Sequence, residues 1–145
     1  MIRTEQEYQL TTQKLAEQDA RIRQQMDELK ALGIDKAGIK RVLDPLRSFS
    51  DKMREEIEAY DRLKRGEFPE VENLAGMGEL LIALRIAKGI TQRELAQRMG
   101  VNESQVSRDE RNEYHGMTLD RAQRILEALE VQMTTTVKSL SAAAV

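Results

Sequence analysis

Cysteine is absent from the 145-residue sequence, and histidine occurs only once. The lack of cysteine excludes disulfide frameworks, thiol nucleophiles and cysteine-based zinc sites. The single histidine, His115, leaves too few ligands for a histidine-based metal site and too few groups for histidine-dependent triads. We therefore expect a protein that is not an enzyme and that holds neither a metal nor a cofactor.

Long apolar runs and aromatic residues are also scarce. No stretch approaches the roughly 20 consecutive apolar residues that a membrane-spanning helix needs, and the N-terminus is polar where a signal peptide would be apolar. Only 3% of the residues are aromatic and tryptophan is absent, so Leu, Ile, Met and Ala must fill the core. The composition predicts a soluble, cytoplasmic, helical protein with no membrane partner, either one domain or a small domain with a helical extension.

The charge is nearly balanced, with 23 basic against 25 acidic residues and a net charge of −2. A bulk basic signature for nucleic acid is therefore missing. If the chain binds DNA, its positive charge must collect on one face of the folded protein.

Two long amphipathic helices are predicted in the N-terminal half. Thr4 and Glu7 form a capping box that starts one helix at about Glu5, and nothing interrupts that helix before Gly33. Asp44-Pro45 repeats the start signal, and the second helix then runs to Gly66. Joined by about ten residues, the two helices should form an antiparallel hairpin over residues 1–66. The apolar stripes that would meet are Tyr8, Leu15, Ile22 and Leu29 on the first helix, and Leu46, Phe49, Met53, Ile57, Tyr60 and Leu63 on the second.

Three further segments follow the hairpin. Residues 67–76 have the composition of a linker, residues 77–131 form a unit of short helices, and residues 132–145 form a tail. From Val131 to Val137, apolar or β-branched residues alternate with polar ones. This period of two fits a short strand that needs an edge to pair with, and it equally fits a frayed tail.

The short-helix unit contains a distinctive pair of helices. Thr91 and Glu94 form a second capping box, and Gly100 ends the helix after about two turns. Asn102 then caps a third helix that is anchored by Val106. Two short helices with a glycine turn and a small residue for close approach, Ala96, are what a helix-turn-helix requires.

The stretch ITQRELAQRMGVNESQVSRDE, residues 90–110, resembles the helix-turn-helix of the lambda-repressor/Cro-like (XRE) regulators. Their usual pattern is T-Q-x-x-L-A-x-x-x-G-V-x-x-x-x-V-S-x-x-E, and MTLDRAQRILEALEV, residues 117–131, resembles the helices that close their domain. The resemblance implies an all-α chain whose C-terminal part, residues 77–131, is a five-helix domain that binds double-stranded DNA. The matched positions are Thr91, Gln92, Leu95, Ala96, Gly100, Val101, Val106, Ser107 and Glu110.

The resemblance also assigns candidate DNA contacts. Gln92 lies where family members contact a phosphate at a helix start, which free helix N–H groups favour. Arg108 can fork onto a guanine, and Glu103 can accept from a cytosine amino group. Asp109 and Glu113, by contrast, put negative charge close to the expected DNA face. The candidate contacts are Gln92, Arg93, Asn102, Glu103, Ser104, Ser107, Arg108 and Arg111, with Lys88 and Arg98 as further phosphate partners.

Three functions remain open at this point. The first is a repressor of the XRE class that binds a palindromic operator as a homodimer. The second is an antitoxin that neutralises a protein toxin and represses its own operon, because IRTEQEY (residues 2–8), IEAYDRL (residues 57–63) and the C-terminal helix-turn-helix resemble HigA-type antitoxins. The third is a scaffold that merely keeps the fold, for which Arg108→Ala and Gln92→Ala would leave function unchanged.

Overall fold

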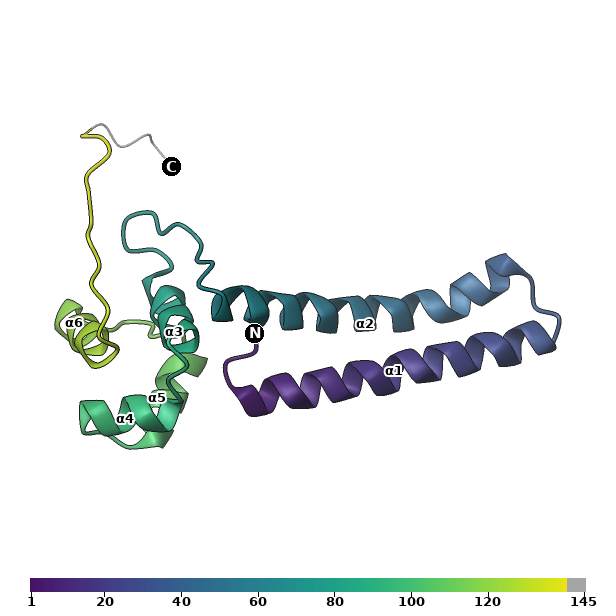
Figure 1. Cartoon of the computed structure of the whole chain (residues 1–145). Coiled ribbons are helices and arrows are strands. Elements are labelled where there is room, and N and C mark those ends of the chain that lie inside the picture. The colour runs from purple at the N-terminus through teal and green to yellow at the C-terminus, as the bar shows by residue number, and fades with distance from the viewer. Residues whose placement is uncertain (141–145) are drawn as a thin grey trace.

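The computed structural model describes residues 1–140, which form six α-helices and no strand. Figure 1 shows the first two helices as a long antiparallel hairpin, with the other four packed together at its open end, where the N-terminus also lies. The all-α prediction is confirmed, and no helix in the described part of the chain is long and apolar enough to cross a membrane. The helices are α1 (Glu5–Ala31), α2 (Lys36–Lys64), α3 (Met77–Ala87), α4 (Gln92–Met99), α5 (Glu103–Arg111) and α6 (Leu119–Ala128).

The first helix begins where its capping signal predicts. The Thr4 hydroxyl accepts a hydrogen bond from the Glu7 backbone N–H at 3.2 Å, and the Glu7 carboxylate accepts from the Thr4 N–H in return. Ile22, in the middle of the predicted apolar stripe, is buried against α2, with Met26 and Leu29 packed beside it. The stripe of α1 therefore faces its partner helix as expected.

The second helix begins earlier than predicted. Its N-cap is Asp35, whose side chain accepts from the Gly38 N–H at 2.9 Å, so Pro45 lies inside the helix and the connection shrinks to residues 32–35. Proline removes only one backbone donor, and Ile39 and Leu43 pack against α1 with 8% and 0% of their surface exposed. This packing stabilises the helical turns before Pro45. The local start signal at Asp44-Pro45 carries no information about that packing, so the predicted start was too late.

Several apolar side chains on the hairpin remain exposed. Phe49, expected in the buried stripe of α2, is 59% exposed, and Val42 lies two turns before it at 44%. Leu32, in the connection at the tip, is 76% exposed. Phe49 thus corrects the predicted stripe, because that position falls at the edge of the α1–α2 contact.

The open end of the hairpin packs directly on the C-terminal helices. Ile2 and Tyr60 are 4% and 5% exposed, and they belong to the same hydrophobic core as Leu81 of α3 and Ile125 of α6. The hairpin and the C-terminal unit, which the predicted linker (residues 67–76) connects in sequence, therefore share one hydrophobic core that holds them together.

The C-terminal unit has four helices rather than the five expected. Between α5 and α6 the chain makes a series of turns over residues 112–116. Glu113 and Tyr114 both have a φ of 52°, in the left-handed region, and Gly116 has a φ of 74°. Consecutive left-handed residues cannot continue a right-handed helix, so α5 ends before this turn. In residues 117–131, where the resemblance implied more than one closing helix, the chain forms the single helix α6.

The described part of the predicted tail, residues 132–140, contains no strand. A strand needs a neighbouring backbone to pair with, and the other elements of the described chain are helices with no free sheet edge. Residues 141–145, the rest of the predicted tail, lie outside the described residues.

Candidate nucleic-acid interface

Helices α4 and α5 are held at a sharp turn. The capping box at Thr91 starts α4, with the hydroxyl of Thr91 accepting from the Glu94 N–H at 3.1 Å. Gly100 ends α4 with a φ of 68° and a ψ of 31°, a left-handed conformation that suits glycine. Asn102, in extended backbone, then precedes α5. The chain therefore turns between the two helices within three residues, and the two short helices pack against each other.

The apolar side of this pair faces the core. Leu95 and Ala96 of α4 are 1% and 2% exposed, and Val106 of α5 is 1% exposed. Because the inward side of α5 is fixed in this way, its polar side faces solvent. The geometric requirement for a recognition helix is met.

The predicted contact residues lie mostly on that open side. Ser104 and Arg108 stand one turn apart, and the Arg108 Nε donates to the Ser104 backbone carbonyl at 3.3 Å, which leaves the rest of the guanidinium outward. Six of the eight candidates are exposed and two are half-buried: Arg93, Asn102, Glu103, Ser104, Arg108 and Arg111 belong to the first group, Gln92 and Ser107 to the second.

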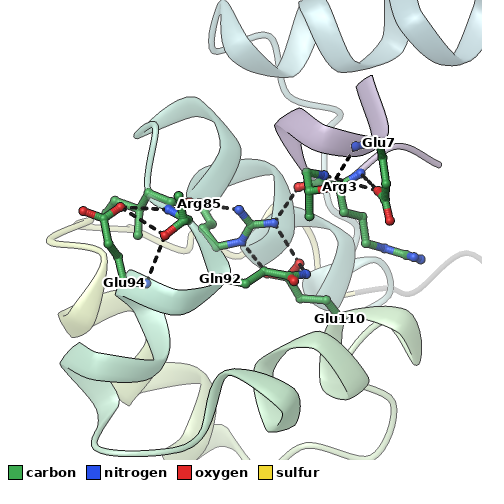
Figure 2. Close-up of polar contacts among 9 residues, drawn as sticks. Arg3, Glu7, Arg85, Gln92, Glu94 and Glu110 are labelled. Carbon is green, nitrogen blue, oxygen red and sulfur yellow. Dashed lines mark hydrogen bonds and ion pairs between the residues drawn. The ribbon is translucent and has the colours of Figure 1, made fainter. Parts of the chain in front are cut away.

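Gln92, at the start of α4, has a partner within the protein. Its side-chain amide donates to the Glu110 carboxylate at 2.7 Å (Figure 2). This contact fixes the side chain between α4 and α5. The second N–H of this amide and the first backbone N–H groups of α4 remain as donors for a phosphate. The phosphate contact itself stays a prediction.

A buried ion pair that was not predicted from the sequence lies behind the recognition helix. Arg85 of α3 and Glu110 of α5 are 3% and 0% exposed, and two guanidinium nitrogens of Arg85 meet the two carboxylate oxygens. Arg85 also donates to the Ile90 carbonyl at 2.9 Å and to the Arg3 carbonyl at 2.8 Å. An arginine in the most apolar helix of the chain was the available signal, since charged residues are almost never fully buried unless paired.

Two charges near α5 point elsewhere than expected. Asp109, expected to oppose DNA binding, is paired with Arg121 of α6 at 2.5 Å. Arg98, expected to meet a phosphate, instead donates to the Ala128 carbonyl at the end of α6 at 2.8 Å. The first pairing reduces the negative charge that we expected near the interface, and the second engages a cation that we expected there.

The turn after α5 is packed tightly against α3. A Cβ at Gly78 would lie 1.8 Å from the Glu113 backbone oxygen, so only glycine allows the approach. Tyr114 is buried, and this burial, together with the nearby Glu110 carboxylate, raises the pKa of its phenol. His115 is exposed, and among the described residues no group of three or more metal-ligating side chains comes together.

A glycine-linked helix pair on a buried core, with the polar side of its second helix open, defines a helix-turn-helix. Residues 81–135 match a family model described as helix-turn-helix. Residues 81–135 thus form a helix-turn-helix domain of the XRE type, a class of domain that binds DNA in regulators of transcription. The match covers the C-terminal unit and leaves the N-terminal hairpin outside it. No curated protein and no solved structure matches the chain.

Proposed function

We propose that this protein is a repressor that binds a palindromic operator as a homodimer and acts by binding rather than by catalysis. The single observation that carries the proposal is the outward polar side of α5, fixed by Leu95, Ala96 and Val106 behind it. Such a helix enters the major groove with its N-terminal side chains at the base edges.

The proposed contacts divide into two kinds. Ser104, Ser107 and Arg108 lie on the open side of α5 and would meet base edges or the backbone at its centre. Gln92 and Arg93, at the start of α4, would meet the phosphates. Two copies would place their α5 helices about 34 Å apart, one helical turn of DNA, in successive major grooves.

The test is a footprint on the DNA upstream of the gene, followed by binding titrations of variants. Arg108→Ala should weaken operator binding by about 1–3 kcal/mol and relax the preference at one base pair. The matched control is Arg124→Ala, an exposed arginine on α6, which should bind as wild type does. A sequence-independent footprint, or equal binding by Arg108→Ala and wild type, would overturn the proposal.

A second candidate is the antitoxin function. It is favoured by Val42 and Phe49, two exposed apolar side chains that lie two turns apart on the same side of α2, since adjacent exposed apolar surface marks contact sites for proteins. On this proposal the hairpin binds a protein toxin while the C-terminal unit represses the operon.

Co-expression with the neighbouring reading frame tests the antitoxin function. A co-purifying complex and rescue of growth are expected, and Phe49→Asp should abolish both. A neighbouring product that is neither bound nor neutralised would remove this candidate while leaving the repressor proposal intact.

A further inference from the structure

The N-terminal segment that precedes α1 is fixed beside the helix-turn-helix. Ile2 is buried in the shared core with 4% of its surface exposed. The Arg3 backbone N–H donates to the Glu7 carboxylate at 2.8 Å, and the Arg3 carbonyl accepts from Arg85 at 2.8 Å. Arg3 is therefore positioned by bonds on both sides of its Cα, one to the hairpin and one to the C-terminal unit.

The bond to Arg85 places Arg3 close to the expected DNA contacts. Arg85 joins Glu110 of α5, and Glu110 accepts in turn from Gln92, the first residue of α4 (Figure 2). A continuous polar network thus runs from the Arg3 carbonyl to the helix start that is expected to meet a phosphate. The open end of the hairpin and the DNA-binding unit meet at this network.

The Arg3 side chain has no acceptor for one of its donors. Within residues 1–140 its Nε is buried and unpartnered, whereas the Glu110 carboxylate is taken by Arg85 and Gln92. Figure 2 shows the Arg3 side chain beside this network, with the guanidinium directed away from the Arg85–Glu110 pair and no drawn contact to it. The Glu7 carboxylate meets the backbone N–H groups of Arg3 and Thr4.

Arg3 as a whole is only half-buried, so the terminal nitrogens of its guanidinium, rather than the buried Nε, can meet an anionic oxygen from outside the protein. Its planar fork of donors matches phosphate geometry, and its charge is weakly hydrated, so it loses little on leaving water. We propose that Arg3 binds a backbone phosphate of the DNA that α4 and α5 engage, so that the hairpin contributes directly to DNA binding. This inference rests on the proposed function and adds a contact from outside the helix-turn-helix.

The experiment measures binding of the full chain to its upstream DNA and to a random duplex of equal length, by fluorescence anisotropy over a salt series. Arg3→Ala should weaken binding to both duplexes by a similar factor, about threefold or more. The slope of log affinity against log salt should become shallower by about 0.9, the value for one lost phosphate contact. Arg3→Lys, which keeps the charge, should keep the slope.

Two further variants guard the interpretation. Arg21→Ala removes an exposed arginine from α1, about 24 Å along the helix from its first residue, Glu5, and should leave the affinity and the slope unchanged. If Arg3→Ala loses stability in thermal unfolding, Arg3→Gln serves in its place, because it retains a longer side chain. Its binding then reports the effect of removing the charge. Arg3→Gln should then show the shallower slope.

The possible failures are separable. If wild type binds its upstream DNA with specificity and both neutral variants keep its affinity and slope, Arg3 is a surface residue over the core and this inference is wrong. A loss confined to the operator, absent on the random duplex, would also overturn it, because phosphate contacts are sequence-independent. If wild type binds neither duplex, the proposed function fails together with it.

Discussion

The ion pair between Arg85 and Glu110 gives the sharpest stability prediction. In Glu110→Gln the shape of the side chain is kept, but Arg85, 3% exposed, loses its counter-charge inside the core. Removing one member of a buried pair costs about 3–5 kcal/mol, because the remaining charge is uncompensated. The amide oxygen of glutamine still accepts one hydrogen bond, so the lower end of that range, about 3 kcal/mol, is expected.

The measurement is urea unfolding with linear extrapolation, supported by thermal unfolding. For a chain of this size, about 3 kcal/mol lowers the Tm by roughly 6–12 °C. The matched control is Glu127→Gln on α6, an exposed carboxylate that accepts from Gln123 at 3.0 Å. Its stability should stay within about 0.5 kcal/mol of wild type.

A double-mutant cycle isolates the pair. Arg85→Met alone leaves Glu110 buried and also frees the carbonyls of Ile90 and Arg3. The double variant Arg85→Met/Glu110→Gln carries no buried charge, so it should lose less stability than the sum of the single variants, by at least about 1 kcal/mol. Additive losses, or a Glu110→Gln variant within about 1 kcal/mol of wild type, would refute the reasoning.

Three further predictions follow from single contacts. Gly78→Ala should lower the free energy of unfolding by about 2 kcal/mol or more, measured in urea, because its Cβ would overlap the Glu113 carbonyl. Arg98→Ala should cost about 1 kcal/mol in the same assay, through the lost bond to the Ala128 carbonyl, while DNA affinity stays at the wild-type value. Because the folded pKa of Tyr114 is raised, its contribution to stability is complete below the ordinary value near 10 and is lost as the pH rises above it. Tyr114→Phe should therefore flatten the decline in unfolding free energy above pH 10.

Each of these has an outcome that contradicts it. A Gly78→Ala variant as stable as wild type would mean that α3 and the turn after α5 are not in close contact. Equal losses of DNA affinity in Arg98→Ala and Arg108→Ala would return Arg98 to the interface. An equally steep alkaline decline in Tyr114→Phe would move its cause to Tyr8 and Tyr60, whose pKa values are also raised.

Local signals in the sequence predict the helix starts that depend on one cap. Thr4 and Thr91 start α1 and α4 as expected, since a capping box lies within four residues and needs no tertiary partner. The start of α2 was predicted wrongly, because Asp44 with Pro45 offers the stronger local signal, whereas the burial of Leu43 against α1 favours a start at Asp35.

The features that sequence reasoning missed depend on contacts between distant residues. The bond from Arg85 to the Arg3 carbonyl spans 82 positions, and no periodicity links the two residues. The helix-turn-helix was predictable because its buried residues and its turn lie within one short stretch. The packing of the hairpin on that unit was not, because Ile2 and Tyr60 have no sequence signal that names their partner.

The length of the hairpin and its packing on the C-terminal unit determine how far from the duplex a protein partner bound to the hairpin would lie. Helix α1 has 27 residues and is therefore about 40 Å long, roughly the span of twelve base pairs. A partner bound at the connection between α1 and α2 would lie far from the DNA and would not affect repression. A partner bound at the end of the hairpin near Arg3 and Arg85 would compete with the duplex. Mapping where a partner binds along the hairpin would therefore distinguish an inducer from a partner that leaves DNA binding unchanged.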